Sequence, residues 1–369
     1  MALARPITRW ETQTRECILR CFTESDPVSY GEFCFFRDKT SNSALSRPVG
    51  DKRGHKAAIH PLAFSRPLKK RNISVPSKAY LALIIATLCW GGNTVAGKLA
   101  VGHISPMAFT FLRWVLAVAI IFAISLPQLI KDWPVVKKRL PYFFVLGSIG
   151  YTAFNVFLYT ALQHTSAINA AVIQAGIPMV IFVLNFILFR TRVLFGQIAG
   201  FCLTIAGVAL LASHGDPVSL LQLEMNAGDA IMLLAVLVYA IYTVILRWKP
   251  IVDWRTLMAI PAFFALLTSV PLVFWEISRD NVVWPDQKGW VLVVYAAIFA
   301  SLIAQILYIK GVEQIGANRA GLFINLVPVF GTLLSVIVLS ETLHPYQIAA
   351  LVMALAGIAV AERKKSPAS

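Results

Sequence analysis

A near-continuous succession of apolar stretches occupies this chain from Ala79 to about residue 362. Each stretch is close to the roughly 20 residues that an α-helix needs to cross the hydrocarbon core of a bilayer. Over the whole chain 58% of the residues are hydrophobic and 14% are charged, whereas soluble domains carry about 25% charged residues. These properties exclude an ordinary water-soluble fold and predict an all-α integral membrane protein.

Hydropathy and helix-breaking residues divide this region into ten transmembrane helices. Proline stands in the predicted first turn of three of them, at Pro106, Pro141 and Pro345, where a missing amide proton leaves no intrahelical bond unmade. The predicted helices cover residues 78–101, 106–127, 141–162, 167–189, 194–213, 227–247, 255–275, 288–309, 319–340 and 345–362.

The formal net charge of +15 is explained by basic residues in the connections between membrane helices. No solvated basic face with groove-reading or base-stacking elements is visible in the sequence, so nucleic acid is not expected as a partner. Lys and Arg concentrate in alternate connections, and the positive-inside bias then predicts an inner (plasma) membrane protein with both termini in the cytoplasm. The residues assigned to the cytoplasmic side are Lys131, Lys137, Lys138, Arg139, Arg190, Arg192, Arg247, Lys249, Arg255, Lys310, Arg319, Arg363, Lys364 and Lys365.

Residues 1–76 differ from the rest and are predicted to be a disordered, basic N-terminal extension that is largely dispensable. Cys17 with Cys21, and His55 with His60, have spacings that a zinc ion could use. The gap between the two pairs, however, far exceeds the usual roughly 12 to 15 residues. We therefore expect neither a metal site nor a cofactor.

An internal repeat organises the ten helices into two units. The segment ALQHTSAINAAVIQAGIPMV aligns without a gap with GVEQIGANRAGLFINLVPVF at an offset of 150 residues, which pairs Pro178 with Pro328. Each unit has five helices, an odd number, so the second unit must cross the membrane in the opposite sense to the first. Inverted repeats of this kind place a binding site near the midplane, where the units meet. The units are residues 77–213 and 227–362.

Four stretches carry a family resemblance. They are CWGGNTVAGKLA from Cys89, SPMAFTFLRWVLA from Ser105, LQHTSAINAAVIQAGIPM from Leu162 and NLVPVFGTLLSVIVLSETLHPYQIAALVMALAGI from Asn325. Together they resemble the EamA-type branch of the drug/metabolite transporter superfamily over residues 77–362. The resemblance implies ten helices around a central cavity, export or exchange of amino acids, sugars, nucleosides or toxic compounds, and no nucleotide cofactor. Members often carry Glu at the ends of both the fourth and the ninth helix, whereas here Thr191 stands opposite Glu341.

Polar side chains at mid-helix are the candidates for lining such a cavity, because polar groups in hydrocarbon usually face the bundle interior. Asn155 and Gln305 are repeat mates, which favours a place at the midplane. The alternative is that Asn and Gln hydrogen-bond one helix to the next, as they often do in membranes. The predicted substrate-binding residues are Asn93, Tyr151, Asn155, Tyr159, Gln174, Gln305, Tyr308 and Asn325.

Prolines and charged residues inside the predicted helices suggest a conformational change. Pro178 and Pro328 each remove a backbone donor near mid-helix and act either as hinges or as fixed kinks. One hypothesis is a gate in which Lys98 or Arg113 contacts Glu341 in one state and, in the other, releases it or meets a substrate carboxylate. The alternative is that Lys98 snorkels to the interface and Arg113 has a permanent ion pair.

The sequence thus predicts a secondary transporter, an exporter or exchanger, that moves a small molecule such as an amino acid or a drug across the lipid bilayer by alternating access. A channel and an integral membrane enzyme are the alternatives. The enzyme is disfavoured because the sequence has no HExxH, no suitably placed GxSxG and no mid-helix acid pair. Gly196 and Gly200 form a GxxxG pair, which favours close packing within one protomer and leaves a homodimer open.

Overall fold

The computed structural model of the chain describes residues 77–190, 195–213, 215 and 226–362. The predicted extension, residues 1–76, lies outside these described residues, and so do four basic residues used for the topology, Arg192, Arg363, Lys364 and Lys365. Every regular element of the described part is helical.

The elements within the described residues form ten spans, and five of these spans contain a break or a change of helix type. The composite spans are α4–η1–α5, α6–α7, α10–η2, α12–η3–α13 and α14–α15, in which η1 and η3 are π-helical and η2 is a 3-10 turn. The bounds are α2 (Ser77–Leu99), α3 (Pro106–Val136), α4 (Leu140–Leu146), η1 (Gly147–Ala153), α5 (Phe154–Ala161), α6 (Ala167–Gln174), α7 (Ile177–Phe189), α8 (Phe195–Ala212), α10 (Ala227–Ile245), η2 (Leu246–Trp248), α11 (Trp254–Ser278), α12 (Gln287–Tyr295), η3 (Ala296–Ile303), α13 (Ala304–Ile315), α14 (Ala317–Ile324), α15 (Leu326–Leu339) and α16 (Pro345–Glu362).

Two spans continue well beyond their predicted C-terminal ends. The sequence suggested that the second span ends near residue 127, but α3 continues through Pro127 and Pro134 to Val136. Membrane helices tolerate proline because neighbouring groups satisfy the carbonyl oxygens that it frees. The eighth span continues beyond residue 309 to Ile315 and is followed by Gly316, whose φ of 85° suits a residue without a side chain.

Length and composition make eight of the spans candidate membrane crossings, and α8 and α16 are shorter apolar helices. Large apolar side chains stand exposed on the spans: Ile187 is 62% exposed and Ile337 is 73% exposed. Extended apolar exposure of this kind is unfavourable in water and suits contact with lipid. The chain is therefore a multi-pass membrane protein.

The two halves repeat the same irregularities at the offset of 150 residues. A break separates α6 from α7 just before Pro178, and another separates α14 from α15 just before Pro328. The segments η1 and η3 occupy equivalent places in the third and eighth spans. The fourth and ninth spans each end in a left-handed residue, Arg190 (φ 47°) and Ser340 (φ 54°). These matches confirm the two-repeat, ten-helix architecture.

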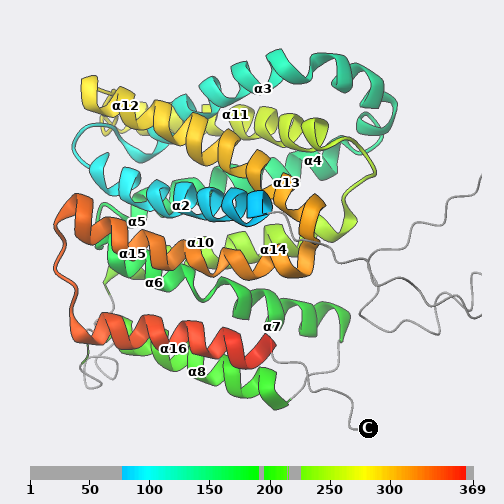
Figure 1. Ribbon diagram of the computed structural model, residues 1–369. Coiled ribbons are helices and arrows are strands. Elements are labelled where there is room, and N and C mark those ends of the chain that lie inside the picture. Colours follow the sequence, from blue (N-terminus) through cyan, green and yellow to red (C-terminus); the bar gives the residue numbers. More distant parts are fainter. Residues whose placement is uncertain (1–76, 191–194, 214, 216–225, 363–369) are drawn as a thin grey trace, which may run out of the picture. The chain divides into compact units, whose positions relative to one another are not determined.

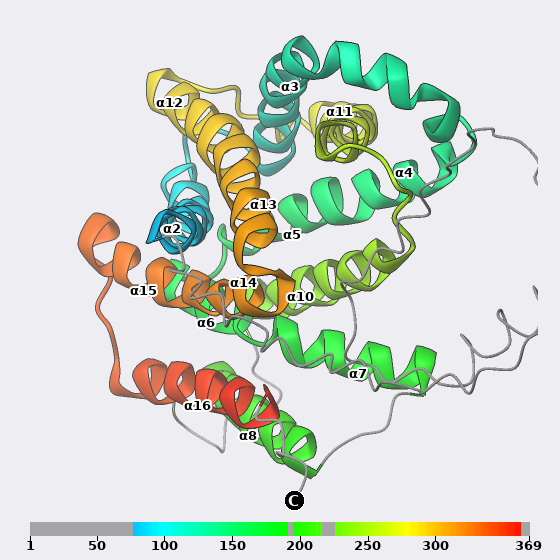
Figure 2. The same ribbon diagram turned by 45° about the vertical axis from the view of Figure 1, so that its right-hand side comes forward.

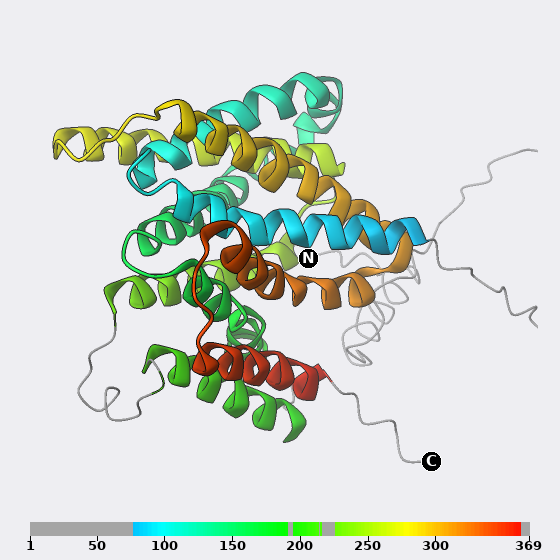
Figure 3. The ribbon, with the colours of Figure 1, turned by 60° about the vertical axis from the view of Figure 1, so that its left-hand side comes forward.

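The halves interlock. Helix α2 packs against α13 and α15 of the second half, and its equivalent α10 packs against α5 and α7 of the first. Equivalent helices also meet directly, α3 with α11 and α8 with α16, and α8 and α16 run side by side in all three views (Figures 1, 2 and 3). A Cβ on Gly357 of α16 would lie 2.6 Å from the carbonyl oxygen of Gly200 in α8. Small residues here permit close packing within one chain, and a homodimer stays a prediction.

The bundle has two ends, which differ in their connections. The basic end holds the connections after α3, α7, η2 and α13 and carries Lys137, Lys138, Arg139, Arg190 and Lys249. The capped end, on the left in Figure 1, holds the connections after α2, α5, α11 and α15.

Candidate functional site

A cavity of about 140 Å³ lies between the halves, beside the breaks in the fourth and ninth spans. An internal cavity of about 150 Å³ accommodates one benzene-sized molecule, so this space suits a small solute. Its wall combines aromatic rings with a few polar groups. The lining residues are Trp90, Asn93, Arg113, Trp114, Gly150, Tyr151, Phe154, Asn155, Leu158, Gln174, Ala175, Ile177, Pro178, Tyr239, Tyr242, Ala300, Ser301, Gln305, Ile324, Asn325, Val327 and Pro328.

Most of the polar residues singled out from the sequence meet at this cavity. Six of the eight predicted substrate-binding residues line it, and substrate binding by them stays a prediction. Tyr159 and Tyr308 are not part of the wall, which corrects their predicted place. The ring of Tyr159 stacks on Phe109 at 4.3 Å between centroids, and the ring of Tyr308 packs on Trp90 at 5.3 Å. The six residues are Asn93, Tyr151, Asn155, Gln174, Gln305 and Asn325, and Arg113, Pro178 and Pro328 lie beside them.

Sequence reasoning missed several wall residues, including Trp114, Tyr239, Tyr242 and Ser301. Ser301 could have been found, because it is the repeat mate of Tyr151 at the offset of 150. Tyr242 reaches the wall because it packs on Gly150, where a Cβ would lie 2.0 Å from the tyrosine Cδ2. That contact joins distant segments and leaves no signal in the sequence.

The π-helical segments shape the wall. Tyr151 lies in η1 and Ser301 lies in η3, and each is followed one turn later by a wall amide, Asn155 or Gln305. The hydroxyl of Ser301 donates to the carbonyl oxygen of Ala296, five residues earlier, at 2.9 Å. Short π-helical stretches are rare and frequent at functional sites. Their equivalent places in the two halves indicate that the wider π-helical turns help to form the cavity wall.

Arg113 is the charged group of the wall. Its side chain is 5% exposed, and its contacts come from three other spans. Nε donates to the Ser301 hydroxyl at 2.7 Å, and Nη1 donates to Asn155 Oδ1 at 2.6 Å and Asn93 Oδ1 at 3.2 Å. Nη1 also donates to the Tyr159 hydroxyl at 2.6 Å, which in turn donates to Asn93 Oδ1 at 3.0 Å. All of these partners are neutral.

The ion pair suggested for Arg113 is therefore wrong. Among the described residues the single ion pair joins His103 to Asp286 and does not involve Arg113. The guanidinium is instead held by hydrogen bonds and by the ring of Trp114, 5.3 Å from Cζ. Trp114 in turn stacks on Tyr151 at 4.9 Å with the planes 5° apart. The result is a hydrogen-bonded patch with a net positive charge.

Lys98 and Glu341 lie away from the cavity wall and hold the connection between α5 and α6. Lys98 Nζ donates to the carbonyl oxygens of Leu162 at 2.9 Å and Thr165 at 2.7 Å. The Glu341 carboxylate accepts from the amides of Ala167 at 2.9 Å and Ile168 at 3.0 Å. A cation at a helix C-terminus and an anion at a helix N-terminus both complement the helix dipole. Lys98 and Glu341 thus act on the same connection, and a direct contact between them is not part of this state.

Two further buried acids, which the sequence did not single out, lie near the capped end. Glu276 accepts from the Ser105 hydroxyl at 2.6 Å and from the Ala108 amide at 3.1 Å, at the start of α3. Asp229, in the first turn of α10, accepts from the Thr165 hydroxyl at 2.5 Å. Together with Glu341 they tie helix starts to neighbouring spans.

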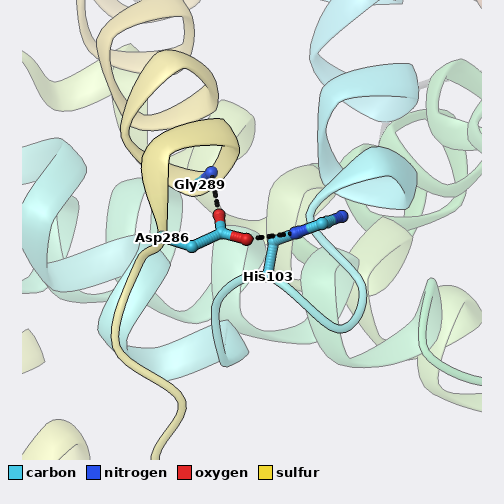
Figure 4. Close-up of polar contacts among 3 residues, drawn as sticks. All are labelled: His103, Asp286 and Gly289. Atoms are coloured by element: carbon cyan, nitrogen blue, oxygen red, sulfur yellow. Dashed lines mark hydrogen bonds and ion pairs between the residues drawn. The ribbon is translucent and has the colours of Figure 1, made fainter.

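Another polar contact joins the connection after α2 to the start of α12 (Figure 4). Asp286 caps α12 by accepting from the Gly289 amide at 2.8 Å, and its other oxygen lies 2.6 Å from His103 Nδ1. The Gly289 amide, and after it the His103 ring, hold the pKa of the Asp286 carboxyl below its ordinary value. Polar ties therefore cross the capped end at several places.

The repeat symmetry is broken between α6 and α14. In α6, at the capped end, every residue from Ala167 to Ile173 is buried, and α6 packs against α2, α10, α15 and α16. Its equivalent α14, at the basic end, packs mainly against α2, α13 and α15 in the described part of the chain. Val172 of α6 is fully buried, whereas its repeat mate Leu322 is 51% exposed.

The same asymmetry appears in the packing of the broken spans. Helix α15 lies along α6 at the capped end, whereas the equivalent pair, α7 and α14, shows no comparable packing among the described residues. The bundle is closed at the capped end and loose at the basic end. In the described part of the chain the broken spans thus pack together at the capped end and not at the basic end.

Comparisons with known proteins agree with this architecture. The chain matches the EamA-like transporter family twice, over residues 77–213 and 226–362. It is 25% identical to the uncharacterized transporter YetK of Bacillus subtilis (strain 168), over 78% of this chain and 87% of that protein. It is 26% identical to the uncharacterized transporter YyaM of the same organism, over 76% of this chain and 92% of that protein.

Two more distant likenesses are consistent with these. A chloroplastic WAT1-related protein of Arabidopsis thaliana is 24% identical over 76% of this chain and 68% of that protein. A crystal structure with 23% sequence identity has a TM-score of 0.53 and covers 78% of this chain and 97% of its own, which shows the same fold. The two family matches together span most of the chain, so it belongs to the EamA-like transporter family and is a membrane transporter.

Proposed function

We propose that the protein is a secondary transporter that carries small metabolites or drugs by alternating access through the central cavity. The observation that carries this proposal is the broken symmetry between α6 and α14. Two halves with equivalent sequence and connectivity adopt different packing, one closed and one loose. Inverted repeats that exchange these two arrangements expose a midplane site first to one side of the membrane and then to the other.

The exchange has a defined geometry in this chain. In the opposite state α14 would pack along α7 at the basic end, and α6 would separate from α15 at the capped end. The breaks before Pro178 and Pro328 lie at the cavity and are the proposed bending points. Proline there removes a backbone hydrogen bond and so lowers the cost of bending.

The basic end is proposed to face the cytoplasm, because Lys and Arg gather there as the positive-inside bias requires. The structure would then be an inward-facing state of an inner-membrane protein, ready to load a substrate for export or exchange. None of the described wall residues is an Asp or Glu. That wall composition favours exchange or facilitated diffusion over a proton relay through a cavity carboxylate.

Flux across reconstituted vesicles tests the proposal. The full chain is placed in liposomes, and efflux of candidate solutes is followed with and without an excess of the same solute on the other side. A carrier gives saturation and accelerated counterflow, because the loaded site returns faster than the empty one. Flux that stays linear with concentration and shows no counterflow would identify a channel and refute alternating access.

A further inference from the structure

The cavity holds a cation that its own wall does not neutralise. Arg113 lines the cavity, and at 1.5 Å rise per residue it lies roughly 10 Å below the start of its helix. A buried charge in a membrane protein is costly unless it is paired. The described wall residues supply amides, hydroxyls and rings but no carboxylate.

The guanidinium also has donors to spare. It carries five N–H groups; Nε is used by Ser301, and Nη1 by Asn93, Asn155 and Tyr159. In the described part of the chain, no hydrogen bond involves Nη2. Nη2 is not one of the fully buried polar atoms that lack a hydrogen-bond partner. Part of its surface is therefore accessible. Two N–H donors and a full positive charge are thus available to a molecule in the cavity.

The bonds that hold the other nitrogens fix the orientation of the group. Ser301 and Asn155 come from the π-helical segments or directly follow them, in opposite halves of the protein. The charge is therefore held between the two repeats before any ligand arrives. A pre-organised donor binds an anion with little ordering cost, and a charge-assisted hydrogen bond is the strong kind.

The rest of the wall is aromatic. Rings of Trp90, Trp114, Tyr151, Phe154 and Tyr239 surround the space, and its volume of about 140 Å³ suits a molecule near the size of one substituted ring. No described wall group offers a negative charge for an ammonium. Arg113 and the aromatic wall together thus favour a ligand with one anionic end and an apolar remainder.

We propose that the transported substrate is a small organic monocarboxylate that binds Arg113 through its carboxylate and the aromatic wall through its apolar part. This assignment rests on the transporter function proposed above. It gives Arg113 the counter-charge that the protein itself does not provide. It also selects against cationic solutes, which would meet a like charge in the cavity.

Binding by the purified full chain tests the assignment separately from transport. Quenching of tryptophan fluorescence is titrated with 3-phenylpropanoate, with 3-phenylpropanol as the neutral isostere and with 3-phenylpropylamine as the cationic one. The carboxylate should bind about ten- to a hundred-fold more tightly than the alcohol, and the amine should bind most weakly. Equal affinities for the three, or a preference for the amine, would overturn the proposal without any variant being made.

Variants locate the site. Arg113→Met should abolish the preference for the carboxylate, and Arg113→Lys should reduce it, because a lysine keeps the charge but loses the planar fork. Arg279→Met, which removes an exposed arginine near the capped end, should change nothing. A folded Arg113→Met protein that keeps the full preference would refute the assignment, and a misfolded one leaves the decision to Arg113→Lys and the isostere series.

Counterflow with labelled 3-phenylpropanoate separates the two proposals. Selective carboxylate binding without counterflow would keep the anion site and reject alternating access. Counterflow of neutral or cationic solutes without carboxylate selectivity would keep the transporter mechanism and reject the substrate class.

Discussion

Glu341 is predicted to stabilise the state that is closed at the capped end. Its carboxylate, at the end of the ninth span, accepts the amides of Ala167 and Ile168 at the start of α6. Hydrogen bonds to charged groups contribute roughly 1.5–3 kcal/mol each, and neutral ones roughly 0.5–1.5 kcal/mol. Glu341→Gln keeps one neutral acceptor. Because the side chain is partly exposed, we expect a loss of about 1–2 kcal/mol from this state.

That loss lowers the ratio of the closed to the opposite state by roughly 5- to 30-fold. The population of the opposite state can be measured by disulfide formation between Ile181→Cys in α7 and Gly321→Cys in α14. These two positions should meet only in the opposite state. The rate of cross-linking should rise by that factor in Glu341→Gln. Glu313→Gln, the same change at an exposed acid of α13, is the control and should not alter it. Equal rates in the two variants would show that Glu341 does not bias the equilibrium.

Two further outcomes are expected. Gly150→Ala places a Cβ 2.0 Å from the ring of Tyr242 and should lower stability by about 1–3 kcal/mol through overpacking, seen as a lower melting temperature in detergent. Gly321→Ala, which meets open space, should not, and equal melting temperatures would refute the close contact. The pKa of the Asp286 carboxyl should lie below its ordinary value of 3.8. The part of the stability that depends on its charge is therefore present at neutral pH and lost only as the pH falls through that lowered pKa. In His103→Ala an NMR titration should show the pKa raised but still low, because the Gly289 amide contributes most, and a return to the ordinary value would contradict that order of causes.

The spans and the repeat could be predicted from the sequence because they depend on local properties. Apolar runs of bilayer length specify helices whatever their neighbours are, and the offset that pairs Pro178 with Pro328 specifies the second half from the first. The same offset also pairs Tyr151 with Ser301 in the cavity wall, so Ser301 follows from the repeat as well.

The features that could not be predicted depend on contacts between distant segments. The π-helical turns η1 and η3 have no sequence signature as clear as that of a cap or a proline. The ion pair suggested for Arg113 was a reasonable inference from the cost of a buried charge, but the structure supplies neutral partners from three other spans instead. The difference between α6 and α14 belongs to one conformational state, which a duplicated sequence does not specify.

Cross-linking between the broken spans most directly tests whether the two halves exchange their packing arrangements. In a background without the natural cysteines, Ala171→Cys and Gly331→Cys would join α6 to α15, where a Cβ on residue 331 lies 2.9 Å from that of Ala171; a small shift would then reach the roughly 3.5–4.5 Å that a disulfide needs. We expect the 171–331 cross-link to form readily and to stop counterflow, and reductant to restore counterflow. A cross-link between residues 181 and 321, the equivalent pair, should also stop counterflow. A protein fully cross-linked between residues 171 and 331 that still transports at the rate of its reduced form would contradict alternating access by these repeats.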